Sequence, residues 1–432
     1  MTLRARLFWI LDALKGGRQK SHYEDLKEIM ENYSSPNIQE RLSNYLEEEL
    51  NYATEHIEYY KKYKGYKGLQ DFPVINKEIV RDNENTFLDP QYRKEELFKQ
   101  ETSGSTGMPF AVYQDPIKRK RATADTLYFS DLAKYALGQR LYFSRVWDKE
   151  TTRSAFTCFK QNWVIHESAN LSESMIEKFL TELENDKRKK SVIIFASTLS
   201  AITQYIATKR GKTTAKVESF ITLSESLDPT TKKLAKDQFG CAVISRYSDQ
   251  ELGIMAQQEC DSDDFLLNVG SYIFEFLDLD EDKPVEPGKP GRIVVTDLFN
   301  RSMPLIRYDT GDIAIPKPTK KGELPRLLTV EGRRVDFIYN TSGDLISPYV
   351  INTPMHEFQD ISQYQFIQNG EKDYKMLLNL RVGLTEFARE QDMLTMLQSF
   401  LGSDAKIKVE YVDEIPVLKS GKRKQVVNNY KK

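Results

Sequence analysis

Residues 191–251 read SVIIFASTLSAITQYIATKRGKTTAKVESFITLSESLDPTTKKLAKDQFGCAVISRYSDQE and alternate apolar runs with helical patterns. The runs of strand length lie at 191–197, 219–224 and 241–247. Two helices are predicted between them, one from about Leu199 to Arg210 and one from Pro229 to Phe239, and a glycine follows each. The order strand–helix–strand–helix–strand predicts a parallel sheet with right-handed crossovers.

Polar clusters follow the second and third of these strands. Ser224 to Ser226 ends one strand, and Arg246 to Glu251 ends the next. Because ligands bind beyond the carboxyl ends of parallel strands, we expect both clusters at one edge of the sheet. Either cluster alone is typical of a turn, but two clusters at one edge favour a ligand site.

A loop rich in small donors lies upstream, in ETSGSTGMPFAVYQD at residues 101–115. Its small residues are Thr102, Ser103, Gly104, Ser105, Thr106 and Gly107. Such hydroxyls and exposed backbone N–H groups can wrap an anion such as phosphate, and a polar surface turn is the alternative. The loop is expected to join two extended segments. Asp115 and Pro116 then predict the start of a long helix that ends at Gly138.

The segment after residue 251 favours antiparallel strands. Residues 272–280 and 291–298 are strand-like and are separated by a stretch rich in turn residues. Further on, Asp309 and Asp312 flank a tight turn that is predicted at Thr310 and Gly311.

The last hundred residues read as a small α+β unit. Strands are predicted at 374–382 and 406–412, with a helix at 385–402 between them. The predicted fold is therefore of the α/β class. It has a large N-terminal domain of α/β subdomains with a β subdomain, residues 1–332, and a small mobile α+β C-terminal domain, residues 333–432.

Composition limits the classes of protein. The 432 residues suffice for two or three domains, and a net charge of −2, from 62 basic and 64 acidic side chains, argues against a nucleic-acid binder. Three cysteines form no paired framework, which suggests a cytoplasmic protein. Cys241 and Cys260 as metal ligands are an alternative that no CxxC spacing supports.

The start of the chain contains one amphipathic pattern. Leu7, Ile10, Leu11 and Leu14 fall at helical spacing. We expect this helix to pack on the protein's own core, and contact with a membrane surface through nearby basic residues is the alternative. The apolar run is too short to span a bilayer.

The motifs, taken in order, resemble one family. TSGSTGMP, SES, YSDQE, RYDTGD, GRRVD and a C-terminal SGK follow one another as in the AMP-forming adenylate-forming superfamily, over about residues 70–430. Within it, the likeness is to the phenylacetate–CoA ligase group and the CapK-like proteins of capsular polysaccharide biosynthesis. The resemblance implies a ligase that uses ATP and Mg2+ to convert a small carboxylic acid into its acyl-adenylate. The acyl group would then pass to a thiol such as coenzyme A, or to an amine or hydroxyl acceptor.

The resemblance also implies roles for individual residues. The loop from Thr102 to Gly107 would hold the departing phosphates. The nucleotide would further contact Ser224, Glu225, Tyr247, Ser248, Gln250, Asp312 and Arg333, with Tyr247 stacked on adenine and Asp312 on the ribose hydroxyls. Glu251 would bind magnesium, and Lys422 would reach in from the small domain to stabilise the adenylation transition state.

Departures from the family pattern keep an alternative open. Phe110 stands where members often carry lysine, and Gln250 replaces a threonine that would contact the α-phosphate. A catalytically degenerate nucleotide-binding or scaffold protein of a polysaccharide-assembly complex is therefore the second hypothesis. His166 is either a structural histidine or part of the acid pocket. The oligomeric state, a homodimer included, is left open by the sequence.

Overall fold

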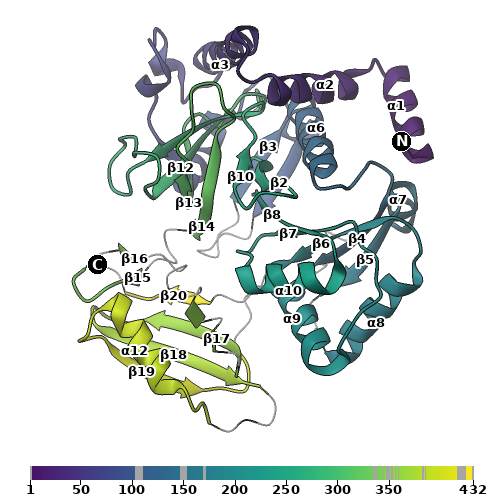
Figure 1. The fold of residues 1–432 in the computed structure, drawn as a ribbon. Coiled ribbons are helices and arrows are strands. Elements are labelled where there is room, and N and C mark those ends of the chain that lie inside the picture. Colours follow the sequence, from purple (N-terminus) through teal and green to yellow (C-terminus); the bar gives the residue numbers. More distant parts are fainter. Residues whose placement is uncertain are drawn as a thin grey trace.

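The computed structural model describes residues 2–102, 110–145, 153–168, 172–333, 338–343, 345–346, 351, 354–355, 357–358, 360–381, 384, 386–415 and 425–430. Figure 1 shows a large body that carries most of the chain and a smaller C-terminal unit, drawn in yellow-green, beside it. No helix in the described part of the chain has the length and apolar character needed to cross a bilayer.

Helices dominate the first hundred residues. They are α1 (Leu3–Leu14), α2 (Arg18–Glu31), α3 (Pro36–His56), α4 (Lys77–Asp82) and α5 (Glu84–Phe87), with 3-10 turns η1 (Lys61–Tyr63), η2 (Leu69–Asp71) and η3 (Lys94–Glu96). The short strand β1 (Ile75–Asn76) precedes α4 and pairs in parallel with a strand more than two hundred residues later, β13 (Tyr308–Pro316). This pairing fixes the start of α4 against the distant sheet.

A hairpin carries the donor-rich loop. Strands β2 (Phe98–Thr102) and β3 (Phe110–Gln114) pair antiparallel, with Thr102 opposite Phe110. The expectation that the loop joins two extended segments is therefore confirmed. The hairpin continues into α6 (Pro116–Leu132), where the Asp115 carboxylate accepts hydrogen bonds from the N–H groups of Ile117, at 2.7 Å, and of Lys118.

The predicted end of α6 was wrong. The helix stops at Leu132 rather than at Gly138. Lys134 adopts a left-handed conformation with φ of 59°, and the Tyr135 N–H turns back to the carbonyl of Ser130 at 2.9 Å. A left-handed residue just after the last turn ends a helix as effectively as glycine does, although it is rarer for lysine.

The parallel sheet is confirmed. Its strands are β4 (Arg140–Arg145), β5 (Trp163–Glu167), β6 (Lys190–Phe195), β7 (Ser219–Leu223) and β8 (Ala242–Ser248). They pair in the order β8-β7-β6-β4-β5, all in parallel. The connecting helices are α7 (Ala155–Gln161), α8 (Glu173–Asn185), α9 (Ala196–Tyr205) with a π turn η4 (Ile206–Arg210), and α10 (Pro229–Phe239).

Helix α10 shows why this region was readable from the sequence. The Asp228 carboxylate accepts the Thr231 N–H at 2.7 Å at its start, and Gly240, with φ of 62°, ends it. Both signals are local, and the apolar face of the helix then packs through Ala235 and Phe239 on the core of the sheet. Local capping and the apolar pattern therefore agree with the tertiary packing.

The β subdomain is not separate from this sheet. Its strands are β9 (Ile254–Gln258), β10 (Phe265–Leu267), β11 (Tyr272–Leu277), β12 (Gly291–Asp297), β13 and β14 (Arg326–Arg333). The predicted antiparallel pairing of the segments around 272–280 and 291–298 is confirmed. However, β9 pairs antiparallel with β8, so both regions belong to one sheet of 12 described strands, of which β1 lies beside β13 and off the main path.

The C-terminal unit has a hydrophobic core of its own. Its elements are β15 (Ile338–Tyr339), β16 (Leu345–Ile346), β17 (Ile361–Gln368), β18 (Asp373–Leu380), α12 (Glu390–Leu401), β19 (Lys406–Tyr411) and β20 (Val426–Asn428). The core residues of this unit all follow residue 337. The boundary at residue 333 remains a prediction.

Two details of this unit differ from the expectation. Strand β17 was not anticipated from its glutamine-rich sequence, yet it lies between β18 and β20 in the sheet. The helix expected from residue 385 begins only at Glu390, where Glu390 and Asp392 place negative charge in its first turn. Acidic side chains are stabilising at a helix N-terminus, which accounts for the later start.

Charged side chains of two helices are buried near Asp297 of β12. The Lys118 ammonium lies 2.6 Å from an Asp297 carboxylate oxygen, and both side chains are buried. Glu49 of α3 is also buried, and neither of its carboxylate oxygens has a hydrogen-bond partner among the described residues. Burial, followed by the charge of Asp297, raises the pKa of Glu49 to about 8.

Candidate active site

The two polar clusters lie at the same edge of the sheet, as predicted. Leu223 of β7 pairs with Arg246 of β8, so Ser224 and Tyr247 follow side by side. Ser224 takes φ of 67°, an unusual left-handed conformation that turns the chain sharply where the strand ends. The Glu225 carboxylate accepts the N–H of Ser197 at 2.8 Å in the first turn of α9. The Glu225 side chain therefore stabilises the start of α9, and the Glu225 backbone lies at the edge of the sheet where β7 ends.

Tyr247 and Asp312 are in direct contact. The Tyr247 hydroxyl donates a hydrogen bond to Asp312 Oδ2 at 2.8 Å and lies 3.3 Å from Thr310 Oγ1. Burial and then the charge of Asp312 raise the pKa of Tyr247 well above its usual value. The tyrosine is therefore a neutral donor that fixes the carboxylate.

Asp312 reaches this position through a bulge, and the tight turn predicted at Thr310 and Gly311 was wrong. Strand β13 continues through this segment, but Asp309 pairs with Val294 whereas Ile313 pairs with Arg292. Three residues of β13 therefore lie opposite Ile293. Gly311 takes φ of 78° within them, which glycine adopts without strain.

Further carboxylates surround this pair. Asp249 Oδ1 accepts the N–H of Leu252 at 2.6 Å. Burial, and then the charge of Glu251 with a smaller part from Asp312, raise the pKa of Asp249 well above its usual value. The side chains of Asp249, Glu251 and Asp312 thus form one negatively charged group, which we call the carboxylate group.

A lysine that sequence reasoning missed faces this group. Lys77 Nζ lies 3.4 Å from Glu251 Oε1 and 4.9 Å from the centre of the Phe110 ring. Lys77 opens α4, just after Asn76, whose side chain accepts the Ile79 N–H at 2.9 Å as the N-cap. A lysine at a helix N-terminus opposes the helix dipole, and this misplaced charge was the signal available in the sequence.

The hairpin strand β3 lies beside Lys77 and Glu251. Phe110 follows the loop directly and lies under Lys77, while Gln114 Nε2 at the other end of β3 donates to the Glu251 carbonyl at 3.3 Å. The two ends of strand β3 therefore contact the Lys77 side chain and the Glu251 backbone. Several predicted site residues lie outside the described part of the chain, namely Ser103, Gly104, Ser105, Thr106, Gly107 and Lys422. The side chains of Thr102 and Arg333 also lie outside it, although the backbone of Arg333 pairs with Asp312.

Arg246 is a buried cation beside the site. It is 7% exposed, and its Nε donates to Gln257 Oε1 at 2.7 Å. Its Nη2 has no hydrogen-bond partner among the described residues. Burial alone lowers the pKa of Arg246 to about 10. Of the other residues of this cluster, Ser248 is half-buried and Gln250 is exposed.

His166 lies away from this group. It is on β5, the edge strand of the parallel sheet, four places from β8. Its Nδ1 is 3.1 Å from Ser144 Oγ, and its ring centre is 4.3 Å from that of Phe179. Burial lowers its pKa. These contacts agree with a structural histidine rather than with part of the acid pocket.

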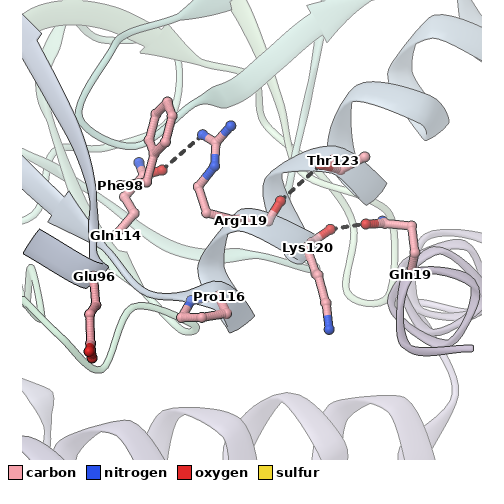
Figure 2. A pocket seen from close by; sticks show the side chains of 8 residues that line it. All are labelled: Gln19, Glu96, Phe98, Gln114, Pro116, Arg119, Lys120 and Thr123. Atoms are coloured by element: carbon pink, nitrogen blue, oxygen red, sulfur yellow. Dashed lines mark hydrogen bonds between the residues drawn. The ribbon is translucent and has the colours of Figure 1, made fainter. Parts of the chain in front are cut away.

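A cavity of about 390 Å³ opens at the far end of the hairpin (Figure 2). There the Arg119 guanidinium stacks on Phe98 at 3.7 Å and donates to Gln114 Oε1 at 3.2 Å. Phe98 begins β2 and Gln114 ends β3, so the cavity and the donor-rich loop lie at opposite ends of the hairpin. The cavity adjoins Glu251 through Gln114, but none of the predicted site residues lines it.

Known structures share this fold. A crystal structure of 2-hydroxyisobutyryl-CoA ligase in the postadenylation state, in complex with R3-HIB-AMP, is 16% identical and has a TM-score of 0.70, with 91% of this chain and 90% of that chain covered. ATP-bound MatB from Rhodopseudomonas palustris is 16% identical, with a TM-score of 0.55 and 77% and 67% of the two chains covered. The chain thus has the fold of AMP-forming CoA ligases, as the order of its motifs predicted.

Sequence comparison leads to a second group. Protein CapK of Staphylococcus aureus is 20% identical over 95% of this chain and 93% of its own length. A family model described as the CapK C-terminal domain matches residues 338–429. Both findings agree with the CapK-like resemblance of the motifs.

The TM-score depends on the state of the first ligase. The same 2-hydroxyisobutyryl-CoA ligase in an open conformation, with 2-HIB-AMP and CoA, gives a TM-score of only 0.55. Since the protein compared is the same, the lower score reflects how its parts are arranged.

Proposed function

We propose that this protein is an ATP-dependent ligase that converts a carboxylic acid into its acyl-adenylate and then transfers the acyl group. The observation that carries the proposal is the Tyr247–Asp312 hydrogen bond of 2.8 Å within the carboxylate group at the end of the parallel sheet. Ligands bind at this edge in open α/β sheets. The fold of CoA ligases and the nearby donor-rich hairpin support the same reading.

The nucleotide would lie along this edge. In the proposed complex adenine stacks on the ring of Tyr247, whose orientation is held by Asp312. The second carboxylate oxygen of Asp312 then faces the ribose hydroxyls, because one carboxylate can accept several hydrogen bonds. The loop of residues 102–107 and Lys77 would hold the β- and γ-phosphates, with Gln250 beside the α-phosphate.

Magnesium fits the chemistry of this site. Its donors are oxygen atoms, which Mg2+ prefers, and the pKa of Asp249 is raised first by burial and then by the charge of Glu251. No group of three or more His, Cys, Asp or Glu side chains suitable for a metal occurs in the described part of the chain. Glu251 would therefore hold Mg2+ together with phosphate oxygens, which is the usual arrangement for this ion. The bound ion would neutralise phosphate charge during the reaction.

The first half-reaction forms one bond and breaks another. A carboxylate oxygen of the acid attacks the α-phosphorus of ATP, the bond to the bridging oxygen breaks, and pyrophosphate leaves with that oxygen. Negative charge grows on the phosphate oxygens, and catalysis consists mainly of positioning and of stabilising this charge. Lys77 from α4 and Lys422 from the C-terminal domain are the cations that we assign to it.

The second half-reaction transfers the acyl group. The acceptor, a thiol such as coenzyme A or an amine or hydroxyl group, attacks the acyl carbon, loses its proton to solvent and displaces AMP. The acceptor needs access that Lys422 would otherwise block, so the C-terminal domain is expected to rotate between the steps.

Pyrophosphate exchange across a panel of carboxylic acids tests the proposal. At least one acid should support acid-dependent incorporation of labelled pyrophosphate into ATP, and Asp312→Ala should abolish it. Calorimetry of ATP binding on the same samples is the control. If none of the acids supports exchange in a protein that binds ATP, the proposal is overturned.

That outcome would favour the second candidate, a nucleotide-binding or scaffold protein of polysaccharide assembly without turnover. Phe110 and Gln250 are the observations behind it, since both replace residues expected to contact phosphate. The Lys77–Glu251 contact argues the other way, because it returns a cation to the place where Phe110 lacks one. A role in surface polysaccharide synthesis rests on the likeness to CapK.

A further inference from the structure

An apolar patch covers one corner of the molecule, on α1 and the neighbouring α7. It consists of Leu3, Leu7, Ile10, Leu11, Leu14, Phe156 and Phe159, all exposed, and we call it the α1–α7 patch. The expectation that the leucines of α1 pack on the protein's own core was therefore wrong, since Leu14 is 79% exposed and Ile10 57%. The core-facing side of α1 is instead lined by Ala5, Phe8 and Trp9, which are buried or half-buried.

Helix α1 is nevertheless firmly attached. The Thr2 hydroxyl donates to the carbonyl of Leu137 at 2.7 Å and also caps the helix. A Cβ on Gly138 would come within 2.5 Å of Thr2 Oγ1, so the helix end sits tightly on this turn. At the other end, Asp12 Oδ1 accepts the N–H of Gln19 at 3.1 Å. The exposure of the patch is thus a fixed feature of the fold.

Basic residues border the patch on both sides. With about 100° per residue in a helix, Leu3, Leu7 and Leu14 share one direction, Arg4 and Lys15 lie on one side of it and Arg6 lies on the other. These cations are exposed. The Arg4 guanidinium also lies 5.7 Å over the Phe159 ring and donates to its carbonyl, which joins α1 to α7. Residues 2–20 carry five basic side chains and one acid, Asp12.

We propose that the α1–α7 patch docks on an anionic membrane surface. An apolar helix face flanked by arginine and lysine is the arrangement with which helices lie in a lipid interface. Contiguous apolar patches on soluble proteins mark interaction surfaces. A second copy of the chain would bring two sets of cations together, so charge complementarity favours anionic lipid. Figure 1 places α1 and the C-terminal domain at opposite corners, so docking leaves that domain free to move.

Vesicle co-sedimentation of the full-length protein tests this proposal. The protein should bind phosphatidylcholine vesicles that contain phosphatidylglycerol, and should bind pure phosphatidylcholine vesicles much more weakly. Leu7→Glu combined with Ile10→Glu should weaken binding roughly tenfold or more, because both side chains lose their apolar contact. Arg6→Gln with Lys15→Gln should weaken binding by about fivefold per charge and make it less sensitive to salt.

Controls separate docking from damage to the fold. Phe400 is an apolar helix residue on α12 whose side chain is 39% exposed, and Phe400→Glu should leave vesicle binding unchanged. If the double glutamate variant unfolds, Leu14→Glu alone replaces it. Failure to bind anionic vesicles, or equal binding by wild type and the α1 variants, would overturn the proposal. The proposal would also be overturned if light scattering showed a dimer that dissociates in the α1 variants, since a second copy would then cover the patch.

Discussion

Replacing Lys77 by methionine tests the cation that the structure adds to the site. The Lys77 and Glu251 side chains are 26% and 9% exposed, and their charged atoms are 3.4 Å apart. Hydrogen bonds to charged groups contribute about 1.5–3 kcal/mol when well formed and buried, and exposed pairs less than about 1 kcal/mol. Because this pair is partly exposed and its distance is long, Lys77→Met should lower the free energy of unfolding by about 1–2 kcal/mol.

The effect on the proposed reaction should be larger than the effect on stability. A positive charge beside the departing phosphates acts mainly where negative charge grows, which is the transition state. Pyrophosphate exchange by Lys77→Met should therefore fall by about 10²–10³-fold, the scale for removing one such donor. ATP affinity, measured by calorimetry, should fall by much less. Lys77→Arg keeps the charge and should keep most of the activity.

Lys94 provides a matched control, because it contacts another aromatic ring of the same strand, β3. Its Nζ lies 5.3 Å over the Tyr113 ring of β3 and 2.6 Å from Glu84 Oε1, so it repeats the cation–aromatic–carboxylate contact away from the donor-rich loop. Lys94→Met should cost similar stability and leave exchange intact. A normal exchange rate in Lys77→Met, or an equal loss in Lys94→Met, would refute the assignment.

Four further changes test other parts of the site and fold. Asp312→Ala should weaken ATP binding by about 1.5–3 kcal/mol in calorimetry, and unchanged affinity in a folded variant would remove it from the nucleotide site. Lys422→Ala should slow adenylate formation by about 10²–10³-fold with little change in ATP affinity, while Lys424→Ala should not. The pKa of Glu49 is raised from 4.5 to about 8 in the folded protein. The stability that the protonated side chain contributes is therefore fully present below pH 4.5 and is lost as the pH rises to about 8. In urea unfolding, the free energy of unfolding of the wild type should therefore fall, relative to that of Glu49→Gln, by up to about 1.4 kcal/mol per pH unit across this window. Parallel plots of unfolding free energy against pH for the two proteins would contradict this prediction. Arg246→Met should raise the unfolding midpoint, because a buried guanidinium whose Nη2 has no partner among the described residues is removed; a lower midpoint would show that its hydrogen bond to Gln257 outweighs that cost.

Much of the α/β region could be predicted from the sequence because its signals are local. Strand β7 and helix α10 have apolar runs, a capping aspartate and a terminal glycine within a few residues of one another. Their parallel order then places Ser224 next to Tyr247, so one half of the candidate site followed from the chain alone. The motif order predicted the fold of the CoA ligases for the same reason.

The other half depends on contacts between distant segments. Lys77 and Glu251 are 174 positions apart, and no pattern near either residue indicates the other. The early end of α6 depends on a left-handed Lys134, and the bulge in β13 depends on its pairing with β12. In each case the competing structure, a longer helix or a tight turn, satisfies the local pattern equally well. Pairing with β12 decided the bulge, and the left-handed Lys134 with its local hydrogen bonds decided the end of α6.

Strand β13 explains how these distant parts meet. Its first two residues, Tyr308 and Asp309, pair with β1, and the bulge begins at the next residue. The bulge turns Asp312 toward Tyr247, and it coincides with the point where β1 ends and Lys77 begins α4. A change that straightened the bulge would therefore move the ribose side and the phosphate side of the proposed site together. One strand thus sets the spacing between a carboxylate and a cation that no local sequence motif connects.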